Sequence, residues 1–266
     1  MRTVSVLFLV TASVFAQAAR PEFEVVDIRP NHSGEADGSG SILPSGQFRA
    51  VNIPVKEVIK FAFGVRNEAI VGAPAWVDSE HFDIIGKAAP VGSEETFWLS
   101  RRSVMLMRLG YHWDETFRQM VQTMLADQFK LTFHREQKTL SVFALEAAKG
   151  GPTLQKSAEP GKPECARTVG ANLVAEATCK SVTMKDLGQA LQVLAELYVD
   201  RDVVDQTGLD GAYDFKLNWV GRTTVDLVGG LTLPAALEKQ LGLKLERRNL
   251  PMAVIVIDRI ERPAEN

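Results

Sequence analysis

The sequence predicts an α+β fold built from about four α-β-β units with antiparallel or mixed sheets. Three observations support this prediction. Amphipathic helical segments alternate with pairs of strand-like segments, similar blocks occur in both halves of the chain, and turn residues separate the segments. The 266 residues are enough for one large domain or two smaller ones, and a hydrophobic content of 45% is ordinary for a globular protein.

Residues 1–18 have the pattern of a secretory signal peptide. Met1 and Arg2 supply a positive charge, 4–15 is mostly apolar, and alanines stand at the −3 and −1 positions of a cleavage site after Ala18. The alternative is a membrane anchor, but the apolar run is shorter than the ~20 residues that cross a bilayer. We therefore expect a secreted or periplasmic protein with no membrane span in its mature chain.

Four helices are expected where apolar residues recur every three or four positions. The first two cover 54–63 and 116–127, and the other two open at Thr183 and Thr232. Thr183 is followed three residues later by Asp186, which is the spacing of a capping box. Each helix would bury one apolar face against a sheet.

Two short strands are expected after each helix. They are predicted at 69–71 and 82–87, at 130–135 and 141–147, at 202–204 and 213–219, and at 243–247 and 253–260. A leading strand at 23–30 is followed by a flexible Gly/Ser loop at 31–41. An additional helical segment at 93–115 would either pack on the surface or dock a partner.

The two halves, 19–148 and 178–266, resemble each other, and this predicts an internal duplication. At one constant offset, "LADQFKLTFHR" (125–135) aligns with "LEKQLGLKLER" (237–247). "IPVKEV" (53–58) aligns with "VTMKDL" (182–187) at an offset of 129, and "FDI" (82–84) aligns with "YDF" (213–215) at an offset of 131. The offset of the first pair of blocks is 112, so the first half carries extra residues before its second helix. The alternative is chance similarity between amphipathic α-β-β units. Repetition at this scale predicts fold rather than chemistry.

The segment 149–177 is expected to link the two halves, because it is rich in Gly, Pro, Lys and Ser at its start. It also contains the first of the two cysteines, Cys165 and Cys179. In an oxidising compartment such a pair is expected to form a disulfide. The alternatives are a redox pair or metal ligands. Redox dithiols usually show Cys-x-x-Cys, however, and zinc sites need more ligands at tighter spacing.

The sequence lacks the motifs of common enzymes. The four histidines are not spaced as in His-Glu-x-x-His, and Gly-x-Ser-x-Gly and the glycine-rich phosphate-binding motifs do not occur. One candidate polar site remains, formed by Asp78, His81 and Asp83, although strand alternation alone also places polar residues on the solvent side. We expect no cofactor and no metal. With a net charge of −3 we expect no nucleic-acid partner.

The stretch "VVDQTGLDGAYDF" (203–215) resembles a calcium loop or a catalytic Asp-Thr-Gly turn at first sight. Its acidic residues do not have the calcium-loop spacing, and Gln206 separates Asp205 from Thr207 and Gly208. A structural turn that uses Gly208, Asp210 and Gly211 is therefore predicted between two strands.

Together these blocks resemble the soil-associated secreted protein family of unknown function. The resemblance covers nearly all of the mature chain and is carried by "FEVVDIRPN", "GQFRAVNIPVKEVIKFAFGV", "GAPAWVDSEHFDI", "MLADQFKLTFHRE", "FALEAAKGGPTL", "VVDQTGLDGAYDFKLNW", "ALEKQLGLKLE" and "VIDRIERPAEN". It implies a secreted globular protein without a known activity. Some longer relatives look like sensor metallopeptidases of the beta-lactam-receptor type. The α-β-β units also look like the short N-terminal modules of secretins and TonB-dependent receptors, which is an analogy of fold alone.

These observations favour a non-catalytic binding module of the cell envelope, with an envelope protein or a small ligand as its partner. The alternatives are an extracytoplasmic ligand-sensing domain and a secreted hydrolase without a recognisable motif. A flat face with an open strand edge would favour the first. A deep apolar pocket would favour the sensor, and acids converging with a histidine in a cleft would favour the hydrolase.

Overall fold

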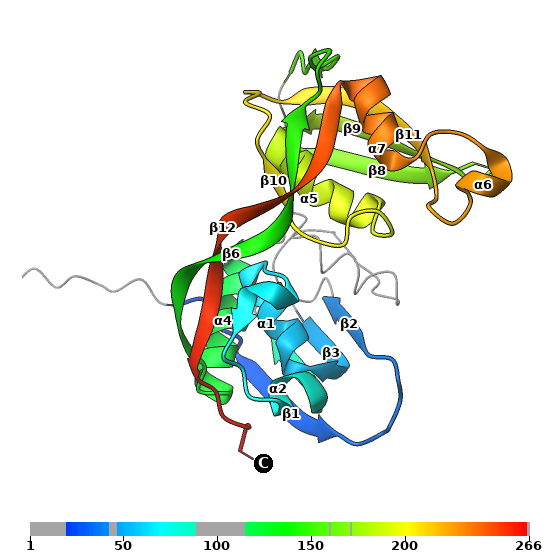
Figure 1. Cartoon of the computed structure of the whole chain (residues 1–266). Helices are drawn as coiled ribbons and strands as arrows, with labels where there is room; N and C mark the ends of the chain where they lie inside the picture. The colour runs from blue at the N-terminus through cyan, green and yellow to red at the C-terminus, as the bar shows by residue number, and fades with distance from the viewer. Residues whose placement is uncertain (1–19, 43–46, 89–114, 160, 171, 265–266) are drawn as a thin grey trace, which may run out of the picture.

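Two lobes are joined by a long, twisted pair of strands (Figure 1). The computed structural model describes residues 20–42, 47–88, 115–159, 161–170 and 172–264. The predicted signal peptide, 1–18, lies outside these residues, as does the predicted helical segment 93–115 except for Glu115. Helices combine with mostly antiparallel sheets, so the chain has the α+β fold that the sequence predicts.

The first lobe is an antiparallel sheet covered by helices, with the strand order β1-β5-β3-β2. Its strands are β1 Val25–Asn31, β2 Ser39–Ile42, β3 Gln47–Pro54 and β5 His81–Lys87. Its helical segments are α1 Val55–Phe63, η1 Asn67–Ala69, α2 Trp76–Ser79 and α4 Glu115–Gln128. The apolar face of α1 is buried, and Gly64 ends this helix in the left-handed conformation, with φ 62°. The end of the predicted loop 31–41 is part of β2.

The second lobe has the same architecture, with the strand order β7-β11-β9-β8. Its strands are β7 Gln155–Lys156, β8 Glu164–Val169, β9 Val174–Val182 and β11 Tyr213–Val220. Its helical segments are α5 Met184–Leu194, α6 Val225–Val228, α7 Leu233–Ala236 and η2 Leu237–Leu241. Much of the predicted linker 149–177 is therefore extended and belongs to this sheet. The division of the chain at that segment stays a prediction.

The predicted capping box opens α5. Thr183 Oγ1 accepts a hydrogen bond from the Asp186 backbone N–H at 3.1 Å, and the Asp186 carboxylate accepts one from the Thr183 backbone N–H at 3.1 Å. The fourth predicted helix begins after Thr232, as expected, but it changes from an α-helical turn in α7 to a π-type turn in η2. Gly242, with φ 64°, ends it.

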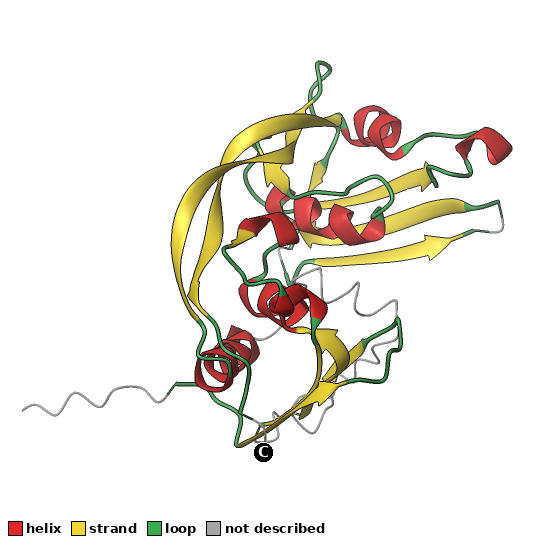
Figure 2. Ribbon diagram, turned by 60° about the horizontal axis from the view of Figure 1, so that its bottom comes forward, coloured by secondary structure: helices red, strands yellow, loops and turns green. Residues whose placement is uncertain are grey.

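A continuous ribbon of two strands connects the lobes and curves along one side of the molecule (Figures 1 and 2). Its strands are β6 Thr132–Ala147 and β12 Leu243–Arg259, which pair antiparallel along their length. The expectation of two separate strands after the second and the fourth helix was wrong. The polar residues that separate the two expected strands of each pair belong to the continuous strands β6 and β12. Between the lobes their side chains are mostly exposed, but their backbones remain paired with the opposite strand.

The pairing of this ribbon follows a two-fold pattern. Thr139 pairs with Pro251, and these residues are related by the offset that relates Leu125 to Leu237. The short strand β4 Ile70–Val71 runs parallel to β12, and β10 Val203–Asp205 runs parallel to β6, which gives the sheet order β10-β6-β12-β4. Ile70 pairs with Ile255 and Val203 with Phe143, again at matching positions. The internal duplication stays a prediction, and this register supports it.

The two halves of the chain exchange strands through the ribbon. The core of the first lobe combines residues of α1 and α4 with Ile257 of β12. The core of the second lobe combines residues of α5, α7 and η2 with Leu145 of β6. Because each core contains a strand from the other half, neither lobe is formed by one contiguous part of the sequence.

Candidate functional site

The three residues of the candidate polar site have different partners. The Asp78 carboxylate accepts a hydrogen bond from Lys56 Nζ at 3.0 Å. His81 Nδ1 lies 3.2 Å from the Ser79 carbonyl oxygen. Asp83 lies on β5 and accepts hydrogen bonds from two asparagines of the neighbouring strands. Within the described part of the chain, no group of three or more His, Cys, Asp or Glu residues is placed to hold a metal ion.

The stretch 203–215 forms the connection between β10 and β11. Gly208 has φ 69° and Gly211 has φ 97°, as a turn that uses these glycines requires. The Asp205 carboxylate accepts hydrogen bonds from the backbone and the side chain of Thr207, at 2.9 and 2.8 Å. The Tyr213 hydroxyl donates a hydrogen bond to the Asp210 carbonyl oxygen at 3.1 Å. These bonds are local, and they hold the turn in shape.

Cys165 and Cys179 form the predicted disulfide. They lie directly opposite each other on β8 and β9, with their Cα atoms 4.1 Å apart. Cys179 is buried in the core of the second lobe. The bond therefore attaches the edge strand of this sheet to its neighbour, and its role is structural.

A cleft of about 510 Å³ lies between the two lobes. One wall is formed by β2, β3, α1 and η1 of the first lobe, and the other by α5 and the residues that come after it. We call it the interlobe cleft. Its described lining residues are Gly40, Phe48, Ala50, Ile53, Glu57, Val58, Lys60, Phe61, Val65, Arg66, Asn67, Glu68, Gln192, Glu196, Leu197, Val199 and Asp200.

The floor of the interlobe cleft is apolar. Phe48 and Phe61 stack with their ring centroids 6.3 Å apart, and both are buried in the core of the first lobe. The opposite wall carries Leu197, whose surface is 60% exposed although it is a large apolar residue. Leu197 therefore adds exposed apolar surface to the lining of the cleft.

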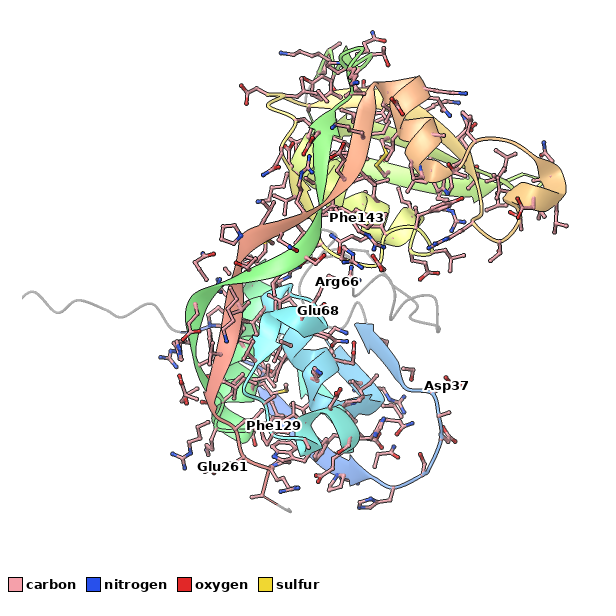
Figure 3. The ribbon with its side chains drawn as sticks, viewed as in Figure 1. Asp37, Arg66, Glu68, Phe129, Phe143 and Glu261 are labelled. Atoms are coloured by element: carbon pink, nitrogen blue, oxygen red, sulfur yellow. A yellow bond between two sulfur atoms is a disulfide. The ribbon has the colours of Figure 1, made fainter. Side chains whose placement is uncertain are left out.

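Arg66 joins the two walls of the cleft. It stands just before η1, and its guanidinium donates to Gln192 Oε1 at 2.8 Å and to the Asp200 carbonyl oxygen at 2.6 Å. Its Nε also lies 4.0 Å from the Asp202 carboxylate. Figure 3 shows Arg66 and Glu68 on the first lobe, at the level where it approaches the second. One side chain thus holds the second lobe at three points.

Charged groups surround the cleft. Lys60 is 8% exposed and forms an ion pair with Glu57 at 2.6 Å. Arg201 forms two hydrogen bonds to the Asp200 carboxylate and lowers its pKa to about 2. Burial raises the pKa of Asp202, Arg66 opposes this shift, and Glu68 adds to it. The cleft therefore has an acidic environment in which most charges already have partners.

Sequence reasoning did not assign any of these cleft residues to a functional site. Arg66 and Leu197 stand in short connections after the first and third helices, where single charged or apolar residues are common. The one signal was Leu197 itself, an apolar side chain beyond the last residue of the predicted helical face. Nothing in the sequence indicated that these two connections meet in space.

The fold and the cleft define a two-lobed α+β protein whose halves exchange strands. The chain belongs to the family described as "Protein of unknown function (DUF3738)", whose pattern matches residues 56–260. This agrees with the expectation of an uncharacterised domain family. No curated protein and no solved structure matches the chain. Among the helices of the described residues, none is long and apolar enough to cross a membrane.

Proposed function

We propose that this chain is an extracytoplasmic, non-catalytic binding module that takes a small ligand in the interlobe cleft. The cleft itself is the observation that carries the proposal. Its volume of about 510 Å³ lies within the range of about 300–1,000 Å³ that is typical of ligand pockets. Its apolar floor and polar rim have the composition of such pockets, and its position between two lobes is also typical.

The lining supports binding rather than catalysis. The described lining of the cleft holds carboxylates but no histidine, so it lacks the convergence of acids with a histidine that would favour a hydrolase. Lys60 is bound by Glu57, and Arg66 is bound by the opposite wall, so neither cation is poised for reaction. A ligand-sensing domain would use the same cleft and would differ only in the response that binding triggers.

The extracytoplasmic location rests on two independent features. The disulfide between Cys165 and Cys179 is typical of proteins that fold in an oxidising compartment. The signal-peptide pattern at residues 1–18 would direct the chain to such a compartment. Expression of the full chain in a bacterial host, followed by N-terminal sequencing of the periplasmic fraction, tests this part. A mature protein that begins after Ala18 is expected, and an uncleaved cytoplasmic chain would contradict it.

The binding proposal is tested by screening small molecules against the mature protein with ligand-observed NMR and thermal shift. We expect binders whose signals are weakened in a Leu197→Gln variant, which removes an exposed apolar side chain of the cleft without adding a charge. Leu227→Gln is the matched control, because Leu227 is 79% exposed and is not among the residues that line the cleft. Binding that is unchanged in Leu197→Gln, or turnover of a bound compound, would contradict a non-catalytic module that binds in this cleft.

A further inference from the structure

We infer that the interlobe cleft selects an organic cation with an apolar body, such as an alkylammonium compound. This inference rests on the proposed function, since it names the class of ligand for the same cleft. Two features of the cleft carry it: two carboxylates that form no hydrogen bond or ion pair within the described part of the chain, and the apolar surface that remains uncovered.

The charges of the described lining are four carboxylates and two cations. Both cations already have partners. Lys60 forms an ion pair with Glu57, and Arg66 donates hydrogen bonds to Gln192 and to the Asp200 carbonyl oxygen. The Asp200 carboxylate is bound by Arg201. Two carboxylates remain, Glu68 and Glu196, and neither takes part in a hydrogen bond or ion pair within the described part of the chain.

These two carboxylates stand on opposite walls of the cleft. Glu68 belongs to η1 of the first lobe, and Glu196 comes after α5 in the second. The charge of Glu68 already acts on its surroundings, because it helps to raise the pKa of Asp202 and that of Arg201. A ligand that enters between the walls therefore meets negative charge from two sides.

The apolar surfaces of the cleft add a second requirement. Glu196 is followed directly by Leu197, which is 60% exposed and lines the cleft together with Phe48 and Phe61. Covering this leucine with an apolar group would remove its surface from water, which contributes roughly 25 cal/mol per Å². A ligand with a charged group and a short apolar chain can satisfy both features at once.

Other ligand classes fit less well. An anion would approach Glu68 and Glu196 while both cations of the lining are engaged elsewhere. A neutral apolar molecule would cover Leu197 but would form no ion pair with the two carboxylates, which are exposed residues. A cation compensates the carboxylates as it displaces their water.

The test uses three probes with the same eight-carbon chain: octylammonium, octanoate and octan-1-ol. Binding to the mature protein is measured by isothermal titration calorimetry at pH 7, below the concentrations at which the probes aggregate. Octylammonium is expected to bind at least about tenfold more tightly than octanoate or octanol, the ratio that corresponds to about 1.4 kcal/mol. Raising the salt concentration is expected to weaken octylammonium binding most.

Two charge variants test whether Glu68 and Glu196 cause the preference for octylammonium. The double variant Glu68→Gln/Glu196→Gln is expected to bind octylammonium and octanol equally, while Glu164→Gln, on the exposed edge strand β8, keeps the wild-type preference. Glu196→Lys is expected to move the preference toward octanoate. Circular dichroism and the Tm of each variant establish that it is folded.

The outcomes separate the two proposals. Octanoate or octanol binding in the cleft as tightly as octylammonium would overturn the selection of a cation and leave the binding cleft intact. An octylammonium preference unchanged in the double variant would overturn it as well. If no probe binds, the selection of a cation is overturned, and the proposed function then rests on the wider screen. If every probe binds equally well to Leu197→Gln, the interlobe cleft is not the binding site and the proposed function fails.

Discussion

Asp83 on β5 accepts a hydrogen bond from the backbone N–H of Asn52 at 2.9 Å. In the second lobe, Asp214 on β11 accepts one from the backbone N–H of Ser181 at 2.8 Å. Both donors are non-glycine residues with positive φ, 54° and 52°, and each stands shortly before a helix N-cap. The aspartates are those of "FDI" and "YDF". Each carboxylate therefore holds the strained junction between a strand and the next helix.

Replacing Asp83 is expected to destabilise the protein. Asp83→Ala removes the acceptor for Asn52 N–H and for Asn31 Nδ2, at 2.9 and 2.8 Å, and leaves both donors in a partly buried site. We expect a loss of about 2 kcal/mol in the free energy of unfolding, measured by urea denaturation. Asp78→Ala is the control and should change it by less than about 0.5 kcal/mol, because its ion pair with Lys56 is exposed. Equal effects would contradict a structural role for Asp83.

The turn before β11 is expected to require glycine at Gly211. Its φ of 97° is unfavourable for any residue with a Cβ atom, although a Cβ there would meet no other atom within 4 Å. Gly211→Ala should therefore cost about 1–2 kcal/mol through the backbone alone. Gly150→Ala is the matched control, since that site is equally open and its φ is not positive. Similar melting temperatures for the two variants would disprove this account.

The disulfide is expected to stabilise the second lobe. The cysteines are separated by 14 residues, and closing a loop of this size contributes about 3 kcal/mol in the chain-entropy model. The double variant Cys165→Ser/Cys179→Ser should lower the free energy of unfolding by about that amount. Thiol titration of the denatured wild-type protein without reductant should detect no free thiol. Detection of two thiols in protein isolated from the periplasm would contradict the bond.

The ribbon contains a pH-dependent contact at His134. Hydrogen bonds with Glu136 and Asp258, at 3.1 and 2.8 Å, raise its pKa above the ordinary value of 6.5. A raised pKa in the folded state means that the stabilisation is complete below about pH 6.5 and is lost as pH rises through the folded-state pKa. NMR titration should place the His134 pKa above 6.5, and Asp258→Asn should lower it. A His134 that titrates at or below its ordinary value would refute this prediction.

Arg66 is expected to hold the two walls of the cleft together. Arg66→Ala removes its hydrogen bonds to Gln192 and to the Asp200 carbonyl oxygen. Amide hydrogen exchange of residues 195–202 should become faster, because this connection loses its contact with the first lobe. Arg29→Ala is the control, since the Arg29 side chain is 76% exposed and pairs only locally with Asp27. Unchanged exchange in Arg66→Ala would show that other contacts hold the lobes.

Features that depend on neighbouring residues were predictable. The α5 capping box, the apolar face of α1 and the turn glycines arise from patterns a few residues long. The disulfide was predictable from the pair of cysteines together with the expected oxidising compartment. The polar site at Asp78, His81 and Asp83 was a different case. These residues are close together in the sequence, but their side chains form hydrogen bonds with different partners.

The α+β class and the order of helices and strands could be predicted from the side-chain pattern, because the spacing of apolar residues in each segment is a local property of the sequence. The strand exchange and the interlobe cleft depend on the folded chain. Thr139 pairs with Pro251 only when two distant strands meet, and Arg66 reaches Gln192 across a separation of 126 residues. Such contacts depend on the geometry of the whole ribbon. A linear pattern records which faces are apolar, but it does not record which of them meet.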